Sequence, residues 1–353
     1  MIKHAIQSTV FSALSRIRSP PQAEELGAKL DTAGVPYTLD PCRACADPCD
    51  LGHEEWPNRF DVDMSSDMLG SVKPYGRQVV ISTGKSDWPR EVTEVSGSLA
   101  EYISNAHNKL ISSAPHPPKS SNAPPGVFVP TESHRLSVLN GSHREIGAAH
   151  TVLVFPDYKL VKDVPPTVEG ADSFWRAAID PAVGREGKVV GGEIKSWTLP
   201  YAAVILLCSH KRRDNRCHIA APVLENSFCT SLSSLGWDVH TQIDDPAEYG
   251  YPAIEDLPEP RADAILEQLQ EIRKPDGQHS QRALILRNSH IGGHKFAGNV
   301  IIYFPTGNGV WYGRVSPHEV QSIVESTIIR GKVLPRLLRG GTFKRDGRPL
   351  MDW

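Results

Sequence analysis

Two cysteines and two histidines, widely separated in the sequence, are the residues best suited to chemistry. Cys208 ends an apolar run, and Cys217 follows after the polar loop Ser-His-Lys-Arg-Arg-Asp-Asn-Arg. His290 and His294 enclose the tripeptide Ile-Gly-Gly. Two thiolates with two imidazoles suit tetrahedral zinc, or a 2Fe–2S cluster in which histidines replace two of the usual cysteines. The spacing alone does not choose between the two.

The elements around these four residues indicate how they could meet. The apolar run Tyr201–Leu207 predicts a strand covered on both faces, and His218–Leu235 predicts the helix that follows it. Ala283–Arg287 predicts a second strand, which leads into His290. Ligands of α/β proteins lie at the carboxyl ends of such strands, and a helix N-terminus there favours thiolate over thiol. If the two strands share one sheet, we expect a four-ligand metal site at its edge.

Other interpretations of these residues stay open. His210 and His218 lie close to the two cysteines in the sequence, and Cys208-Ser-His210 matches half of a Rieske motif. The second half of that motif is missing, because His218 follows Cys217 directly. The simplest alternative is that both cysteines are inert and the histidines only hydrogen-bond a loop.

Strand-like and helix-like patterns alternate in both halves of the chain, which predicts an α/β fold with two tandem α/β domains. In the first half, Arg77–Thr83 predicts a strand and Ser98–Leu110 a helix, with three further strand-like runs. The second half predicts the order β-α-β-α-β-β-β-α, close to a thioredoxin-like layout. The predicted boundaries are an N-terminal segment over 1–40, a first domain over 41–165, a linker over 166–200, a thioredoxin-like domain over 201–338 and a polar tail over 339–353.

Composition excludes several classes of protein. The chain has 353 residues, of which 39% are hydrophobic and 22% charged, and its net charge is −3. This balance gives no electrostatic reason to expect binding to nucleic acid or to acidic lipid. The longest apolar run, Tyr201–Cys208, is far shorter than the roughly 20 residues that span a bilayer. The sequence contains no complete phosphate-loop, dinucleotide or Gly-x-Ser-x-Gly motif, so no enzyme class is indicated.

Three more cysteines cluster near the N-terminus. They are Cys42, Cys45 and Cys49, and His53 follows four residues later. This group predicts a second zinc site of three thiolates and one imidazole, a set of reactive thiols, or no special role. Six cysteines are too few for a disulfide scaffold, and their clustering favours a reducing compartment. Cys229 lies in a predicted amphipathic helix and is expected in the core.

The combined Cys and His motifs resemble the sucrase/ferredoxin-like family. Eight residues with an Arg/Asp-rich interior separate Cys208 from Cys217, and His290 begins the run His-x-Gly-Gly-His-Lys-x-Ala-Gly-Asn-Val. The resemblance extends from about Cys42 to Val333. It implies a thioredoxin-like ferredoxin with a bis-histidinyl, non-Rieske 2Fe–2S cluster. The residues that match the family's ligands are Cys208, Cys217, His290 and His294.

The resemblance also implies a chemistry. Neutral imidazoles make such a cluster less negative than four thiolates would, which eases electron uptake and moves the potential from about −400 mV toward roughly −150 to +300 mV. Each imidazole has an outer N–H, so reduction can couple to protonation. The expected function is one-electron transfer in cellular redox homeostasis. A zinc-stapled interaction module and a thiol oxidoreductase that uses the N-terminal cysteines are the alternatives.

The loop charges and the two chain ends suggest partners and location. A ring of basic residues would surround the cluster and dock an acidic redox partner such as a reductase, although a solvated loop is the alternative. These residues are Lys211, Arg212, Arg213 and Arg216. The final Met351-Asp352-Trp353 resembles the signal by which cytosolic iron–sulfur proteins are recognised for cluster insertion, which implies the cytoplasm. The acid-free first 20 residues make a mitochondrial transit peptide the alternative.

Overall fold

The computed structural model describes residues 20–58, 60–114, 116–117, 123–187, 194–212, 214–272, 281–343 and 350. Within these residues the strands form one mixed, twelve-stranded sheet. The strands are β1 (Arg77–Ser82), β2 (Val127–Phe128), β3 (Leu136–Gly141), β4 (His150–Phe155), β5 (Lys159–Val164), β6 (Lys195–Thr198), β7 (Ala203–Cys208), β8 (Asp238–His240), β9 (Arg282–Asn288), β10 (Val300–Tyr303), β11 (Gly309–Tyr312) and β12 (Leu338–Thr342). The helices are α2 (Pro20–Ala33), α3 (Leu99–Leu110), α4 (Val168–Phe174), α5 (Asn215–Ser234), α6 (Arg261–Glu271) and α7 (Pro317–Ile323).

Both halves of the chain build the same pattern of strands. In the first half β1 pairs in parallel with β3 and antiparallel with β4, and β4 pairs antiparallel with β5. In the second half β7 pairs in parallel with β9 and antiparallel with β10, and β10 pairs antiparallel with β11. One helix follows the first strand of each half. A helix that ends in a π-helical turn follows β5 and β11, before β6 and β12: α4 with Trp175–Ile179 and α7 with Val324–Ile329. The second half adds β8 and α6 before β9.

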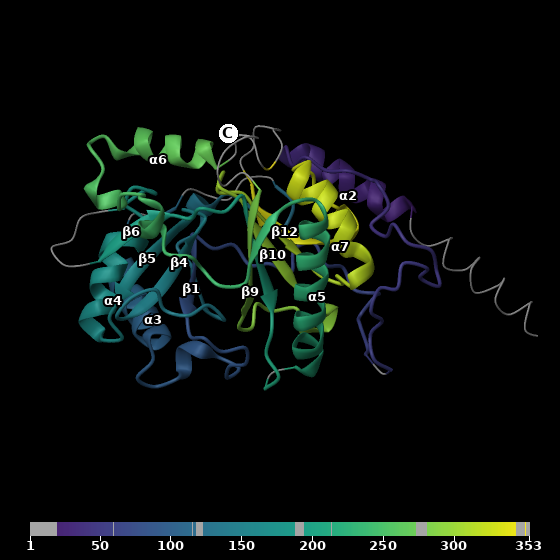
Figure 1. The fold of residues 1–353 in the computed structure, drawn as a ribbon, viewed down its shortest axis with the longest axis horizontal. Coiled ribbons are helices and arrows are strands. Elements are labelled where there is room, and N and C mark those ends of the chain that lie inside the picture. Colours follow the sequence, from purple (N-terminus) through teal and green to yellow (C-terminus); the bar gives the residue numbers. More distant parts are fainter. Residues whose placement is uncertain are drawn as a thin grey trace, which may run out of the picture.

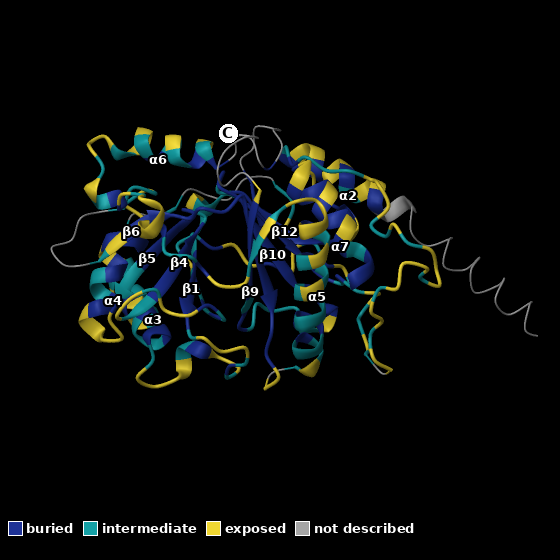
Figure 2. Ribbon diagram, viewed as in Figure 1, coloured by how far each residue is buried: buried dark blue, intermediate teal, exposed yellow. Residues whose placement is uncertain are grey.

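The two halves join at β3 and β9 and face each other across a shared core. The register there contains one residue pair, Gly141 with Asn288. Side chains of both halves meet in one cluster, where the ring of Phe155 on β4 stacks on Tyr303 of β10 with centroids 4.1 Å apart. Helices α3 and α4 cover the outer face of the first half, and α5 and α7 that of the second (Figure 1). The buried strands therefore lie between two layers of half-exposed helices (Figure 2).

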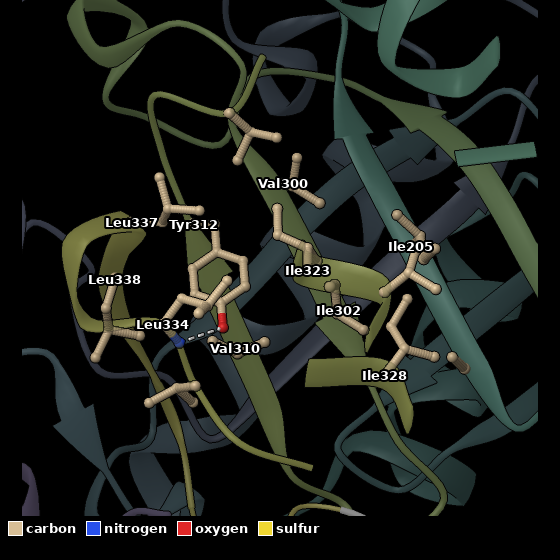
Figure 3. Packing of buried hydrophobic residues seen from close by; sticks show 14 of the residues in the cluster. Ile205, Val300, Ile302, Val310, Tyr312, Ile323, Ile328, Leu334, Leu337 and Leu338 are labelled. Atoms are coloured by element: carbon tan, nitrogen blue, oxygen red, sulfur yellow. Dashed lines mark hydrogen bonds between the residues drawn. The ribbon is translucent and has the colours of Figure 1, made fainter. Parts of the chain in front are cut away.

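Helix α7 is held firmly against the second half of the sheet. Ile323 of α7 and Ile328 of its π-helical turn pack with Ile302 of β10 (Figure 3). The hydroxyl of Tyr312 on β11 accepts the backbone N–H of Leu334 at 3.0 Å. This contact fixes the chain just beyond the helix.

The predicted mixed α/β class is confirmed, and all the pairings join into one sheet. The division into tandem domains, with a thioredoxin-like second one, stays a prediction. Two predicted irregular stretches contain regular structure instead. The 166–200 stretch holds α4 and β6, because Thr167 caps the helix through the N–H of Gly170 and Phe174 supplies an apolar anchor. The 339–353 tail begins inside β12, whose residues are all buried.

Candidate metal centre

The two thiols of the predicted site lie together at one end of β7. Cys208 is the last residue of β7, and Cys217 is the third residue of α5, so both thiols are buried. Asp214 caps that helix by accepting the N–H of Arg216, which starts the turn that carries Cys217. Strand β9 runs parallel to β7 with Asn288 opposite Cys208. The loop that leaves β9 therefore starts beside the thiols.

That loop contains both predicted histidine ligands. Gly292 and Gly293 adopt φ angles of 80° and 68°, in the left-handed region that glycine tolerates best. A tight loop, as the two glycines predict, replaces the helix that a His-x-x-x-His spacing would otherwise suggest. Nδ1 of His290, at the start of the loop, lies 3.0 Å from Nε2 of His210. The loop thus lies beside the group formed by Cys208, His210 and Cys217.

The two thiols have opposite protonation tendencies. Burial would raise the pKa of Cys208, but the hydrogen bonds from Cys217 and from the N–H of Ile291, with the charge of Arg339, lower it. The pKa of Cys217 is raised, because its thiol donates to Cys208 and is itself desolvated. The pair therefore holds its proton on Cys217. The fold stabilises a thiolate at Cys208, which is the form that binds metal.

The histidines gather beside this pair. Cys208, His210 and Cys217 offer ligand atoms that all lie within 4.8 Å of one another. Nδ1 of His290 lies 3.0 Å from Nε2 of His210, and the ring centroids of His290 and His294 are 5.8 Å apart. The thiols and His210 are buried, whereas His290 and His294 are half-buried. The structure therefore groups the two predicted thiols with His210, while the predicted ligands His290 and His294 lie outside that group, with His290 next to His210.

Arg339 completes the surroundings of the thiols, and sequence patterns did not single it out. It lies on β12, is 0% exposed, and donates to the carbonyl oxygen of Gly292 at 3.2 Å and to Oδ1 of Asn299 at 2.8 Å. Desolvation lowers its pKa to about 10, while the charges of Cys208 and Cys217 act to raise it. Arg339 is therefore a buried cation beside two sulfurs at neutral pH. Its position in a Gly/Arg-rich stretch gave the appearance of a solvated tail.

The predicted basic ring is partly neutralised. Asp87, from the first half of the chain, accepts the backbone N–H groups of Lys211 and Arg212. Arg216 forms a salt bridge of 2.8 Å with Asp214. Lys211 and Arg212 are exposed, and Arg213 lies outside the described residues.

Equivalent positions in the first half carry different side chains. Ser82 ends β1 as Cys208 ends β7, and His143 lies two residues beyond β3 as His290 lies two beyond β9. Ser82 accepts the N–H of Thr151 instead of offering a thiol. The shared topology thus carries the two thiols in the second half alone.

The N-terminal cysteines divide into two kinds. Cys45 and Cys49 lie in a second group of possible metal ligands with His53 and His318. Cys42 is outside this group and packs against the core, where burial raises its pKa to about 11. Of the three predicted thiolates, two are therefore close to the predicted His53. His318 on α7 was not expected, because 273 residues separate it from Cys45.

The mixed α/β fold and these two Cys/His groups define a candidate metal-binding protein. Residues 68–340 match the sucrase/ferredoxin-like family, and the chain belongs to it. The match includes the thiol pair, the Gly-Gly loop and Arg339. The predicted family resemblance is confirmed.

Fungal proteins are among the similar sequences. The chain is 27% identical over 306 residues to "Altered inheritance of mitochondria protein 32" of Debaryomyces hansenii, covering 81% of this chain and 89% of that protein. It is 27% identical over 300 residues to "Actin patches distal protein 1" of Saccharomyces cerevisiae, covering 81% and 80%. No solved structure matches with significance. Among the described residues, no helix combines the length and the apolar character that a membrane crossing requires.

Proposed function

We propose that this protein transfers single electrons through a 2Fe–2S cluster held by Cys208, Cys217, His290 and His294. One contact supports this most strongly. Nδ1 of His290, in the loop with both histidines, lies 3.0 Å from Nε2 of His210, whose ring is grouped with the thiols of Cys208 and Cys217. Residues that are some 80 positions apart in the sequence, such as His210 and His290, therefore share one site. Membership of a ferredoxin-like family agrees with this assignment.

The donor set fits a two-iron group. Each iron of a 2Fe–2S cluster takes two protein ligands, and histidine can replace cysteine on one of them. The thiols of Cys208 and Cys217 form one hydrogen-bonded pair, and the neighbouring rings of His290 and His294 form another. Two pairs suit two metal ions, whereas a single tetrahedral ion needs all four donors around one point. When bound, the cluster would supply a one-electron redox couple.

The chain's own residues prepare the site for that couple. Burial of both thiols excludes water from the sulfur side, and the cation of Arg339 balances their negative charge. The half-buried rings of His290 and His294 provide the side from which electrons and protons can exchange with a partner or solvent.

We further infer that the second half is the thioredoxin-like unit of the protein. Its strand order is β9-β7-β10-β11, with β7 and β9 parallel and the other neighbours antiparallel. Helices α5 and α7 pack on one face of it. This arrangement supports the predicted layout.

Partners and location follow from chemistry at the surface. We propose that the exposed Lys211 and Arg212 dock an acidic reductase or other redox partner.

We also propose that Met351-Asp352-Trp353, which lies outside the described residues, recruits the cytosolic iron–sulfur assembly machinery, so the protein works in the cytoplasm. The mitochondrial alternative has the names of several relatives in its favour, and the transit segment that it requires also lies outside the described residues.

A zinc site at the same place is the second candidate function. The observation in its favour is that Cys208, His210 and Cys217 lie close enough to surround one ion. This arrangement would make the protein a zinc-stapled interaction module without a redox role.

Visible absorption with iron and acid-labile sulfide analysis of the anaerobically purified protein distinguishes the 2Fe–2S electron carrier from the zinc module. We expect a coloured protein with about two irons and two sulfides per chain. Cys208→Ala should abolish the colour, and Cys229→Ala, on the same helix as Cys217 but outside the site, should retain it. A colourless wild-type protein that holds zinc at this site would contradict electron transfer and favour the zinc module.

A further inference from the structure

A second group of thiols and imidazoles lies at the first turn of α7. It contains Cys45, Cys49, His53 and His318, whose ligand atoms all lie within 4.8 Å of one another. Sγ of Cys45 is 3.2 Å from Nδ1 of His318, and Sγ of Cys49 is 3.3 Å from Nδ1 of His53. Sulfur and nitrogen bound to one tetrahedral zinc are separated by roughly 3.5 Å. These two sulfur–nitrogen pairs thus already have nearly the separation that a single ion requires.

The surrounding chain does not explain why these groups converge. Residues 41–56 form no helix or strand, and most of them are exposed. Within this segment the two thiols and His53 turn inward while their neighbours face solvent. Apolar contact with the core is limited to flanking residues such as Cys42 and Trp56. An irregular segment with so little buried apolar surface needs another source of stability, and a structural metal supplies it.

Both ends of the group are positioned by ordinary interactions. His318 is in the first turn of α7, where Ser316 and Glu319 form a capping box. Its Nδ1 faces Cys45, and its Nε2 lies 3.0 Å from a carboxylate oxygen of Glu55. Nε of Arg43 donates to Sγ of Cys45 at 3.2 Å.

We propose that Cys45, Cys49, His53 and His318 bind one zinc ion that fastens the N-terminal segment to α7. Two thiolates and two imidazoles are an established structural zinc set, and Cys-x3-Cys with Cys-x3-His has the spacing of such sites. Binding replaces the two thiol protons, which pass to solvent, and no electron is transferred.

The staple has a consequence for the first site. Directly after it, the chain passes along the loop of His294: the N–H of Asp63 donates to the carbonyl oxygen of Lys295 at 2.9 Å. The carboxylate of Asp63 also lies 3.1 Å from Nζ of Lys295, and the carbonyl of Asp61 accepts from Arg216 at 2.9 Å. The zinc therefore anchors the segment that borders the mouth of the proposed cluster site.

Zinc analysis of the full chain tests this proposal. We expect about one zinc per purified wild-type chain, and X-ray absorption at zinc should show two sulfur and two nitrogen neighbours. Cys49→Ala should lose the zinc and keep the visible spectrum. The matched control Cys42→Ala, in the same segment but outside the group, should keep both. Equal zinc content in the two variants, or a Cys45–Cys49 disulfide in the freshly isolated protein, would overturn the proposal.

A second substitution guards against simple misfolding. His318→Cys keeps a valid zinc set, so it should retain the metal and raise the sulfur neighbours from two to three. Unchanged sulfur neighbours would exclude His318 as a ligand. Zinc that disappears in Cys208→Ala and remains in Cys49→Ala would belong to the first site, and this result would overturn both the zinc staple and the iron–sulfur cluster. If only the zinc staple is wrong, the iron content of the protein stays unchanged.

Discussion

The buried guanidinium of Arg339 donates to the carbonyl oxygen of Gly292 and so ties strand β12 to the loop that carries both histidines. The same group donates to the side chain of Asn299, just before β10. Ser71 accepts a third hydrogen bond, from Nε of Arg339. One side chain thus fixes the histidine loop and places a positive charge beside the thiols.

Replacing Arg339 by Gln should lower the reduction potential. Loss of a buried positive charge near the sulfurs disfavours electron uptake, and we expect a fall on the order of 60 mV, a tenfold change in a one-electron equilibrium constant. Arg339→Lys keeps the charge and should shift the potential less. A redox titration followed by absorption measures both. Equal potentials in wild type and Arg339→Gln would show that the guanidinium is structural only.

Replacing Gly293 by Ala should destabilise the protein more than the same change at Gly97. Both glycines have positive φ, 68° and 77°, so each should lose about 1 kcal/mol to backbone strain. A Cβ on Gly97 meets nothing within 4 Å, whereas one on Gly293 would lie 2.4 Å from Nη2 of Arg339. Because Arg339 cannot move without losing charged hydrogen bonds, Gly293→Ala should cost about 3 kcal/mol in total. Urea denaturation of both variants checks this, and equal costs would contradict the packing described.

Replacing His290 or His294 by Cys should keep the cluster and lower its potential. A thiolate adds negative charge to the site, which moves the potential toward the value of about −400 mV for clusters with four cysteines. Voltammetry of the two variants measures the change. A histidine whose replacement leaves the potential unaltered is not a ligand.

Acid should weaken the fold through His143. Complete burial lowers the pKa of His143 to about 4 from 6.5. Between pH 4 and pH 6.5 the imidazole is therefore protonated in the unfolded chain and neutral in the folded chain. The free energy of unfolding should therefore decrease as the pH falls from about 6.5 to about 4, by about 3 kcal/mol from this residue. His143→Gln can still donate to the carbonyl of Thr151 and should flatten that dependence. Denaturant titrations of wild type and His143→Gln across this pH range provide the test. If the free energy of unfolding depends on pH equally in both, the prediction is wrong.

The local patterns of the sequence predicted much of the second half. Most of the run Tyr201–Leu207 belongs to the buried strand β7, Ala203–Cys208, and Gly292 with Gly293 forms a tight loop after β9. These features depend on neighbours in the chain, where hydrophobic periodicity and glycine conformation are informative.

The remainder depends on contacts between distant residues. The polar sequence around Arg339 predicts a surface residue. Only the pairing of β12 with β11 brings it to the histidine loop. Local sequence gives no special role to His318, yet the fold places its Nδ1 3.2 Å from Sγ of Cys45. Likewise, nothing local marks the stacking of Phe155 on Tyr303, which packs the two halves of the sheet together. Such pairings follow from topology, which no window of the sequence contains.

The electron spin echo spectrum of the chemically reduced protein, labelled with ¹⁵N-histidine, most directly tests whether two cysteines and two histidines hold an iron–sulfur cluster. We predict nitrogen couplings from two imidazoles, one of which disappears in His290→Cys. A reduced protein without any imidazole coupling, or one with no paramagnetic iron at all, would contradict the account.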